Sequence, residues 1–138
     1  MPGIEWTGIP EFAAALTRTV ERASVEARAA VAEVAGLLEK TAKQEASGRP
    51  GPNVVTGTLR RSIVHDPITP WGVGGWQTKV GPTVIYGRRI ELGFHGADSL
   101  GRVYNDHGYS YFGPAYDRVT PMIPAIYAKH WARALSGA

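Results

Sequence analysis

The sequence predicts an α+β fold, in which a long N-terminal helix and a C-terminal helix pack on one face of a small antiparallel sheet. Three observations lead to this prediction. Apolar residues recur at helical spacing over residues 9–46. The middle of the chain, 63–112, breaks into short β-prone runs separated by Gly and Pro, and helical spacing returns over 114–135. With 138 residues, the chain is long enough for one domain with its own core.

The first helix is expected to begin near residue 9, because Pro10 suits the first turn of a helix. Trp6, just before it, is expected to anchor on the body of the fold. The apolar positions of the helix form one stripe: Phe12, Leu16, Val20, Ala23, Ala27, Ala30 or Val31, Val34, Leu38 and Ala42.

The length of this helix raises two alternatives. A straight helix over 9–46 is on the order of 55 Å long, whereas a compact chain of this size has a radius of gyration of about 14 Å. The helix therefore either bends over its own sheet, with Gly36 as a candidate position, or projects onto a neighbouring subunit. In the second case, the small side chains of Ala23, Ala27 and Ala30 would allow the neighbour to approach closely.

A Pro/Gly-rich hinge at 47–53 ends the long helix. Thr56 is expected to cap a short helix that runs to Ser62. We expect Leu59 and Ile63 to lock the long helix to the sheet.

The sheet region is predicted to contain several short strands. Residues 63–65, 76–80 and 83–86 are the expected strands, and Gly81-Pro82 is the expected turn between the last two. Residues 71–76 are expected to be a loop or a hairpin tip, and 88–92 fits a helical turn or a strand. The polar, Gly-rich segment 93–108 is predicted to be a long loop or a hairpin, followed by an extended stretch over 109–112.

The last helix is predicted to open at Pro114 and to run to residue 135. Pro121 and Pro124 should force a break near its beginning, because a proline interrupts the backbone hydrogen bonds of a helix.

Composition limits the class of protein. The absence of cysteine excludes disulfides, thiolate metal sites and cysteine nucleophiles. No apolar run approaches the roughly 18–20 residues that span a bilayer, so no membrane association is expected. The net charge of +3 and the pI of about 9.4 are mildly basic, without the dense basic stripe of a dedicated nucleic-acid reader.

No arrangement of residues indicates catalysis. Ser62 has His65 three positions later, but no acid or oxyanion partner is apparent. A weak metal site in 93–108 would use His95, Asp98, Asp106 and His107. A solvated loop is the favoured interpretation there. We therefore expect no enzyme activity, no metal and no cofactor.

Two further groups have competing interpretations. The arginine pairs Arg60–Arg61 and Arg88–Arg89 fit surface ion pairing, with Glu91 as a candidate partner of Arg60, or an interface or lumen role. The aromatic run that includes Tyr109, Tyr111 and Phe112 suits a protein–protein contact, although core packing could use half of it. The candidate subunit interface thus comprises Ala23, Ala27, Ala30, Tyr109, Tyr111 and Phe112.

The most informative stretch is residues 56–63, which we call the first box. It reads Thr-Gly-x-Leu-Arg-x-Ser-Ile and is formed by Thr56, Gly57, Leu59, Arg60, Ser62 and Ile63. A second box, Tyr-Ala-x-x-Val-Glu-x-Gly, is matched at Tyr86, Glu91 and Gly93. A third box, Pro-Phe-x-Arg-Pro-Ala, is matched at Tyr111, Pro114 and Ala115. In this order after a long helix, the boxes resemble the neck and tail-completion proteins of long-tailed bacteriophages over nearly the whole chain.

Four positions depart from the pattern of that family. Gly87 stands in place of Ala, Ile90 in place of Val, Ser110 in place of the first Pro and Gly113 in place of the Arg. The last change removes a charge that could have paired with Glu91.

The resemblance implies a structural virion protein without catalytic residues or cofactors. It implies a ring, most naturally a hexamer, that completes or terminates the tail and joins it to the head. The implied partners are head-closure (stopper) proteins and tail-terminator or tail-tube proteins, and DNA would pass through the lumen without sequence readout. The implied location is the virion, and the host cytoplasm during assembly. The alternative, from a different class, is a small basic nucleic-acid-binding module.

Overall fold

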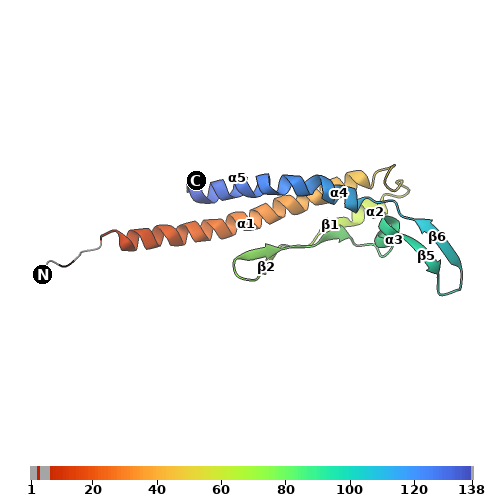
Figure 1. Cartoon of the computed structure of the whole chain (residues 1–138), viewed down its shortest axis with the longest axis horizontal. Helices are drawn as coiled ribbons and strands as arrows, with labels where there is room; N and C mark the ends of the chain where they lie inside the picture. The colour runs from red at the N-terminus through yellow and green to blue at the C-terminus, as the bar shows by residue number, and fades with distance from the viewer. Residues whose placement is uncertain (1–2, 4–6, 138) are drawn as a thin grey trace.

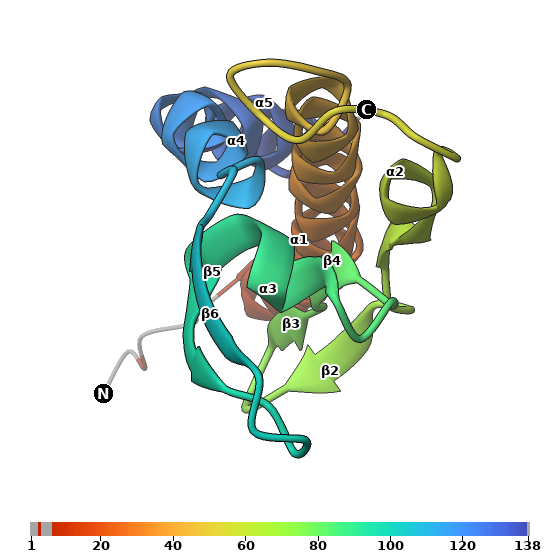
Figure 2. The ribbon, with the colours of Figure 1, turned by 90° about the vertical axis from the view of Figure 1, so that its right-hand side faces the viewer.

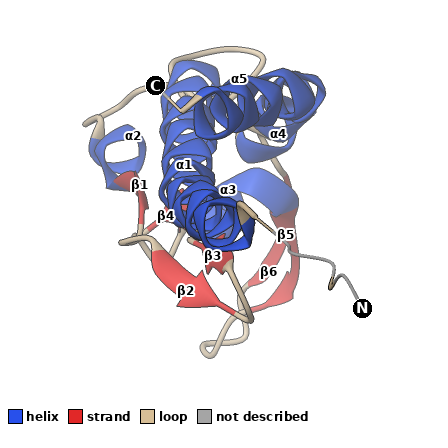
Figure 3. Cartoon of the chain, turned by 90° about the vertical axis from the view of Figure 1, so that its left-hand side faces the viewer, coloured by secondary structure: helices blue, strands red, loops and turns tan. Residues whose placement is uncertain are grey.

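A computed structural model describes residue 3 and residues 7–137 of the chain, so the expected anchor Trp6 lies outside the described residues. The fold is α+β, with a long N-terminal helix, a C-terminal helix and small antiparallel sheets, as predicted. The molecule is elongated, and α1 and α5 run side by side along its length (Figure 1). The helices α1, α4 and α5 lie together on one side and the strands on the other (Figure 3).

Helix α1 (Ile9–Glu45) is one unbroken helix of 37 residues. Pro10 lies in its first turn, and Gly36 causes no interruption. The N-terminal part of α1 extends past the C-terminal end of α5, so the helix projects and does not bend over its own sheet (Figure 1). The contact of this projecting end with a neighbouring subunit stays a prediction.

The C-terminal region is helical from residue 112, two positions earlier than predicted. It consists of α4 (Phe112–Val119), a 3₁₀ turn η1 (Thr120–Met122) and α5 (Ile123–Ser136). The predicted break falls at η1, which contains Pro121, and Pro124 lies in the first turn of α5. The extended stretch predicted over 109–112 is wrong at its end, because Phe112 already belongs to α4.

The antiparallel part consists of three two-stranded ribbons. Strand β1 (Ile63–His65) pairs with β4 (Val80–Pro82), β2 (Thr69–Trp71) with β3 (Gly75–Gln77), and β5 (Gly93–Ala97) with β6 (Val103–His107). Figure 2 shows the ribbons below the helices α1, α4 and α5. The segment 93–108 is therefore the hairpin of the two alternatives.

Two expected strands and one expected turn were wrong, and one strand was missed. The expected strand 76–80 is split between β3 and β4, and Gly81-Pro82 belongs to β4 instead of a turn. Residues 83–86 are not a strand, because they turn into α3 (Gly87–Leu92), and the Gly87 N–H donates to the Val84 carbonyl at 3.1 Å. Strand β2 was missed because it contains Pro70, which a two-stranded ribbon tolerates more readily than the middle of a sheet.

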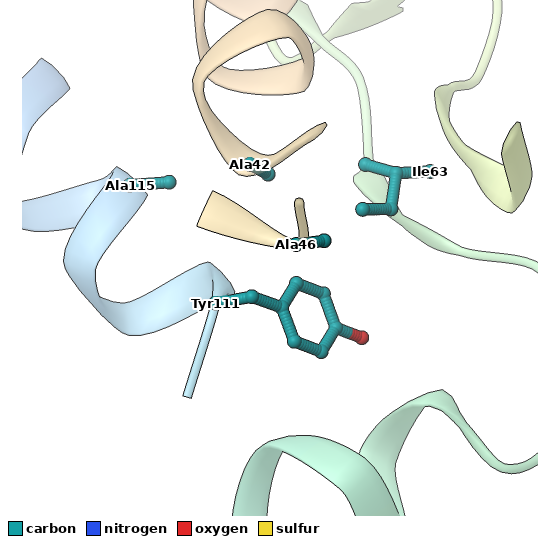
Figure 4. Packing of buried hydrophobic residues seen from close by; sticks show 5 residues of the cluster. All are labelled: Ala42, Ala46, Ile63, Tyr111 and Ala115. Atoms are coloured by element: carbon teal, nitrogen blue, oxygen red, sulfur yellow. The ribbon is translucent and has the colours of Figure 1, made fainter. Parts of the chain in front are cut away.

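The core lies where the C-terminal end of α1 meets β1 and α4. Its buried members are Ala42, Ala46, Ile63, Tyr111 and Ala115 (Figure 4). The partly buried side chains Leu38, Leu59, Ile90 and Phe112 pack against this cluster.

Two residues of the expected subunit interface belong to the interior. Tyr111 is buried in this core, because its ring packs on the end of α1 and its hydroxyl donates to the Gly87 carbonyl at 3.1 Å. Ala30 is fully buried on the face of α1 that α5 covers. Ala23 and Ala27 are half-buried, and Tyr109 and Phe112 are also half-buried. The small-residue stripe thus serves close packing inside one chain at Ala30.

Candidate functional site: a junction of three sequence boxes

The three boxes meet at one place in the fold. The first box supplies Ile63 to the core and Leu59 to its edge, the second supplies Ile90, and the third supplies Tyr111 and Ala115. The C-terminal end of α1, with Ala42 and Ala46, lies between them (Figure 4). Residues that are more than fifty positions apart in sequence are therefore neighbours in space.

Glu91 is the polar centre of this junction. Its Oε2 accepts hydrogen bonds from the Tyr111 and Phe112 N–H groups, both at 2.8 Å. Its Oε1 accepts from the Gly113 N–H at 3.0 Å and from the Ser110 hydroxyl at 2.5 Å. One carboxylate from α3 therefore binds four donors at the start of α4.

This arrangement satisfies the whole N-terminus of α4. The first four backbone positions of a helix have no acceptor within the helix. In α4 these are Tyr111, Phe112, Gly113 and Pro114, and Pro114 has no N–H group. Glu91 binds the other three N–H groups, and its negative charge also complements the helix dipole.

Two of the departures from the family pattern lie directly on Glu91. Ser110 supplies a hydroxyl donor that the proline of the pattern would lack. At Gly113, an added Cβ would come within 3.3 Å of Glu91 Oε1 and 3.0 Å of the Ser110 hydroxyl. A third departure, Gly87, faces Pro82, whose Cγ would lie 2.6 Å from a Cβ at position 87. Ser110, Gly113 and Gly87 therefore each fit the local geometry of this chain.

The environment of Glu91 shifts two pKa values. Burial tends to raise the pKa of Glu91, but its hydrogen bonds from Phe112, Ser110, Tyr111 and Gly113 outweigh this effect and lower the pKa below its ordinary value. Burial, together with the negative charge of Glu91, raises the pKa of Tyr111 to about 12. Glu91 is therefore an ionised acceptor, and Tyr111 remains a hydroxyl donor.

The first box differs in detail from its prediction. Gly57, in a left-handed conformation with φ of 74°, precedes helix α2 (Thr58–Ser62), so the helix starts after Gly57 and not directly after Thr56. The Thr56 hydroxyl accepts a long hydrogen bond of 3.4 Å from the Thr58 N–H. Arg60 donates to the Ser47 hydroxyl at 3.3 Å, and Glu91, its candidate partner, binds the start of α4 instead.

Arg89 fastens the β5–β6 hairpin to α3. Its guanidinium donates to Asp106 at 2.8 Å and lies 4.7 Å from the ring centres of both Phe94 and Tyr104. Gly93 joins α3 to β5 with a φ of 76°. Tyr109, a residue of the expected subunit interface, follows the hairpin, and the Arg49 guanidinium lies 3.8 Å above its ring.

A basic groove lies between α1, α2 and β1. It has a volume of about 590 Å³ and contains four permanent cations, Lys40, Lys43, Arg60 and Arg61, against one carboxylate, Glu39. The excess of three positive charges equals the net charge of the whole chain. Lys43 and His65 each lie 2.6 Å from a carboxylate oxygen of Glu39 and, against the effect of burial, hold its pKa below the ordinary value.

A buried histidine joins the two long helices. His130 of α5 has Nδ1 2.6 Å from a Glu26 oxygen and Nε2 2.6 Å from a Glu33 oxygen, and both acids belong to α1. A neutral imidazole has only one N–H and can donate to only one of these two acids, whereas the imidazolium form donates to both. The neighbouring Lys129 also binds Glu33.

The alternatives that involve catalysis or metal binding gain no geometric support. The Ser62 hydroxyl donates to the Leu59 carbonyl at 2.6 Å, and His65 is engaged with Glu39. In the hairpin, His95 bonds Asn105 and Asp98 holds Arg102. Within residues 7–137, no three His, Asp or Glu side chains are grouped so as to hold a metal ion. In the same part of the chain, no helix is both long enough and apolar enough to cross a membrane.

Sequence reasoning missed two of these features. The Glu26–His130–Glu33 bridge joins residues about one hundred positions apart, and its only local signal was the i, i+7 spacing of two acids on one helix face. Glu91 was singled out in the second box, but its four donors are mostly backbone N–H groups, which no side-chain pattern reveals.

Comparison of the chain with protein-family models, curated proteins and solved structures gave no significant match.

Proposed function

We propose that this chain is a structural subunit of the ring at the head–tail junction of a long-tailed bacteriophage. In this role it completes or terminates the tail and joins it to the head, and it is not an enzyme. Its proposed partners are further copies of itself in a ring, most naturally six, together with head-closure and tail-terminator or tail-tube proteins. Its proposed location is the virion, after assembly in the host cytoplasm.

One observation carries this proposal. The three boxes on which the resemblance depends converge on a single buried junction, where Ile63, Glu91 and Tyr111 each have a defined structural role. Beyond shared apolar burial, Glu91 of the second box binds the backbone N–H groups of Tyr111 and Phe112 in the third, so these two boxes are joined by a specific polar contact. The convergence supports a shared architecture, and a shared architecture supports a shared role only by analogy.

Two surfaces also fit the proposed role. The projecting N-terminal part of α1 provides a means of reaching a neighbouring subunit (Figure 1). The basic groove concentrates positive charge on one side of the chain, which suits a lumen wall that tolerates passing DNA without reading its sequence.

The position of the protein in the particle tests this proposal. A peptide tag on the C-terminal end would be labelled with gold-conjugated antibody in purified virions and located by electron microscopy. We expect label only where the head meets the tail. Label along the tail, at the distal tip, or on no particle at all would contradict the proposal.

The basic groove also favours a second candidate function, a nucleic-acid-binding module. Duplex DNA binding measured over a range of salt concentrations separates the two. A dedicated binder that uses Lys40, Lys43, Arg60 and Arg61 would retain appreciable affinity near physiological salt, with a slope of log K against log salt of about −3 to −4. A lumen surface should give only weak binding that is lost at that salt concentration.

A further inference from the structure

The apolar stripe of α1 is covered along only part of its length. Toward the C-terminal end, the stripe includes the buried Ala30 and Ala42. Toward the N-terminal end, it continues in register as Ile9, Phe12, Leu16 and Val20, whose exposed fractions are between 53% and 69%. We call residues Ile9–Val20 the arm. The arm continues the apolar stripe of α1 beyond the end of α5, and its large side chains are exposed.

Helix α5 ends before it reaches the arm. Gly137, just past its end, lies beside Arg22 of α1, since a Cβ on Gly137 would be 3.4 Å from the Arg22 guanidinium. About 18 Å of α1 therefore extends beyond α5 over the twelve residues of the arm. Figure 1 shows this part of α1 alone at one end of the molecule.

A second uncovered apolar surface, besides the arm of α1, lies on α5. A surface helix normally turns its charged residues toward solvent. In α5, however, Lys129 and His130 bind acids of α1, and Arg133 lines a pocket together with Glu26 of α1. The side turned away from α1, which we call the outer face, has no charge: Pro124, Ala125, Ala128, Trp131, Ala132 and Leu135, all exposed.

The two surfaces match in shape and chemistry. The arm presents large side chains at a spacing of four, Phe12, Leu16 and Val20, which form a ridge. The outer face presents alanines at 125, 128 and 132 beside Trp131 and Leu135, which are 50% and 68% exposed. A ridge of large side chains packs well into a groove floored by small ones.

We propose that the arm of one copy docks on the outer face of α5 in a second copy of this chain. This contact covers both apolar surfaces at once. An arm-to-arm pair would leave Trp131 and Leu135 exposed. Because two different surfaces meet, the contact is heterologous and leads to a ring when the rotation closes. The inference that this contact closes into a ring deepens the proposed function and rests on it.

The small area of the contact makes stable assembly depend on closure of the ring. Six half-exposed apolar side chains contribute about 600 Å² in total, below the roughly 1,200–2,000 Å² of a stable interface. Two free copies therefore associate weakly. In a closed ring each copy uses both surfaces, so the contacts strengthen one another.

Cysteine crosslinking tests the contact directly, because the natural chain has no cysteine. Leu16→Cys and Ala128→Cys proteins, both altered at exposed positions, would be purified separately, mixed at high concentration and oxidised. A disulfide requires Cα atoms within about 7 Å. We expect the mixed Leu16→Cys/Ala128→Cys dimer to be the main crosslinked product and to be lost when Phe12→Asp is added to the arm.

The matched control is Val25→Cys, since Val25 is also exposed on α1 but lies outside the stripe. It should give no disulfide with Ala128→Cys. The proposal is overturned if Leu16→Cys crosslinks mainly with itself, if Val25→Cys reacts equally well, or if no disulfide forms in the concentrated mixture.

A double variant, Leu16→Cys with Ala128→Cys, adds a test of the ring. Within one chain these positions are about 20 Å apart along α1, so the disulfide can form only between copies. Oxidation should give a ladder of covalent oligomers that ends at one closed species. An unlimited ladder would contradict the ring but leave the contact intact, and absence of any ladder would contradict the contact. Gold label away from the head–tail junction would contradict the proposed function and leave the contact unaffected.

Discussion

The Glu91 carboxylate accepts a hydrogen bond from the backbone N–H of Gly113 at 3.0 Å, at a position where any side chain would crowd it. The relationship joins the second and third boxes, and glycine at position 113 leaves the carboxylate room to bind the three N–H groups at the start of α4. Glu91 therefore fixes where α4 begins, and with it the direction in which α5 returns along α1.

Replacement of Glu91 tests this cap. Glu91→Ala would leave three N–H groups and the Ser110 hydroxyl without their acceptor, and should lower the free energy of unfolding by about 1–3 kcal/mol. Glu91→Gln keeps the size of the side chain but loses the charge, and should cost less. Urea unfolding measures both, and equal stability of all three proteins at pH 7 would refute the cap.

The stability difference between the wild type and Glu91→Gln should depend on pH. The folded-state pKa of Glu91 is lowered, so its contribution to stability is full above the unfolded pKa of about 4.3 and is lost as the pH falls through the folded value. Glu33, Glu39 and Asp98 also have lowered pKa values and contribute to acid sensitivity in the same direction. The stability difference between wild type and Glu91→Gln should therefore shrink as the pH is lowered from 6 through this range. A difference that stays constant would show that the charge of Glu91 has no role.

Two glycines should respond in opposite ways to the same substitution. A Cβ at Gly36, inside α1, would meet nothing within 4 Å, so Gly36→Ala should stabilise the protein by about 0.5–1 kcal/mol. A Cβ at Gly87 would lie 2.6 Å from the Pro82 ring, so Gly87→Ala should destabilise it, by about 1–3 kcal/mol. Thermal unfolding gives both signs. Stabilisation by Gly87→Ala would show that Pro82 yields easily and that this departure from the family pattern has no steric cause.

Leu59 tests how the first box holds α1. The side chain is half-buried and packs against the core, so Leu59→Ala should cost about 2 kcal/mol, at the low end of the range for core leucines. Val55, on the same segment, is almost fully exposed, and Val55→Ala is the matched control with an expected change of less than about 0.5 kcal/mol. An unchanged melting temperature for Leu59→Ala would mean that the box does not fasten α1.

His130 tests the link between α5 and α1. Its buried ring binds two acids of α1, so His130→Ala should cost about 2–3 kcal/mol. Lys129→Ala removes a more exposed pair with Glu33 and should cost less than about 1 kcal/mol. If chemical unfolding gives equal small losses for both variants, the buried bridge does not contribute to helix packing.

The helices were predicted well because their apolar spacing is long and regular: α1 starts and ends within one residue of the expected positions. The strands were predicted poorly because each is only three to five residues long and pairs with a single partner, so local propensity has little to add up. Thr83–Tyr86 has β-prone residues but no strand to pair with.

The junction was predictable in its parts but not in its assembly. Glu91 and Tyr111 stood out as box residues, yet the bonds between them depend on how α3 and α4 meet. Ala30 illustrates the reverse case: small side chains predicted a close helix contact correctly, but spacing alone does not say whether the second helix comes from the same chain. Here α5 of the same chain fills that place.

The central claim, a structural role at the head–tail junction, is tested most directly by removing the protein from an infection. An early stop codon would be placed in this gene in the genome that encodes it, and the lysate examined by electron microscopy. We predict DNA-filled heads and tails that remain separate, with joined infectious particles restored by the wild-type gene supplied in trans. Normal numbers of joined, infectious particles without the protein would contradict the account.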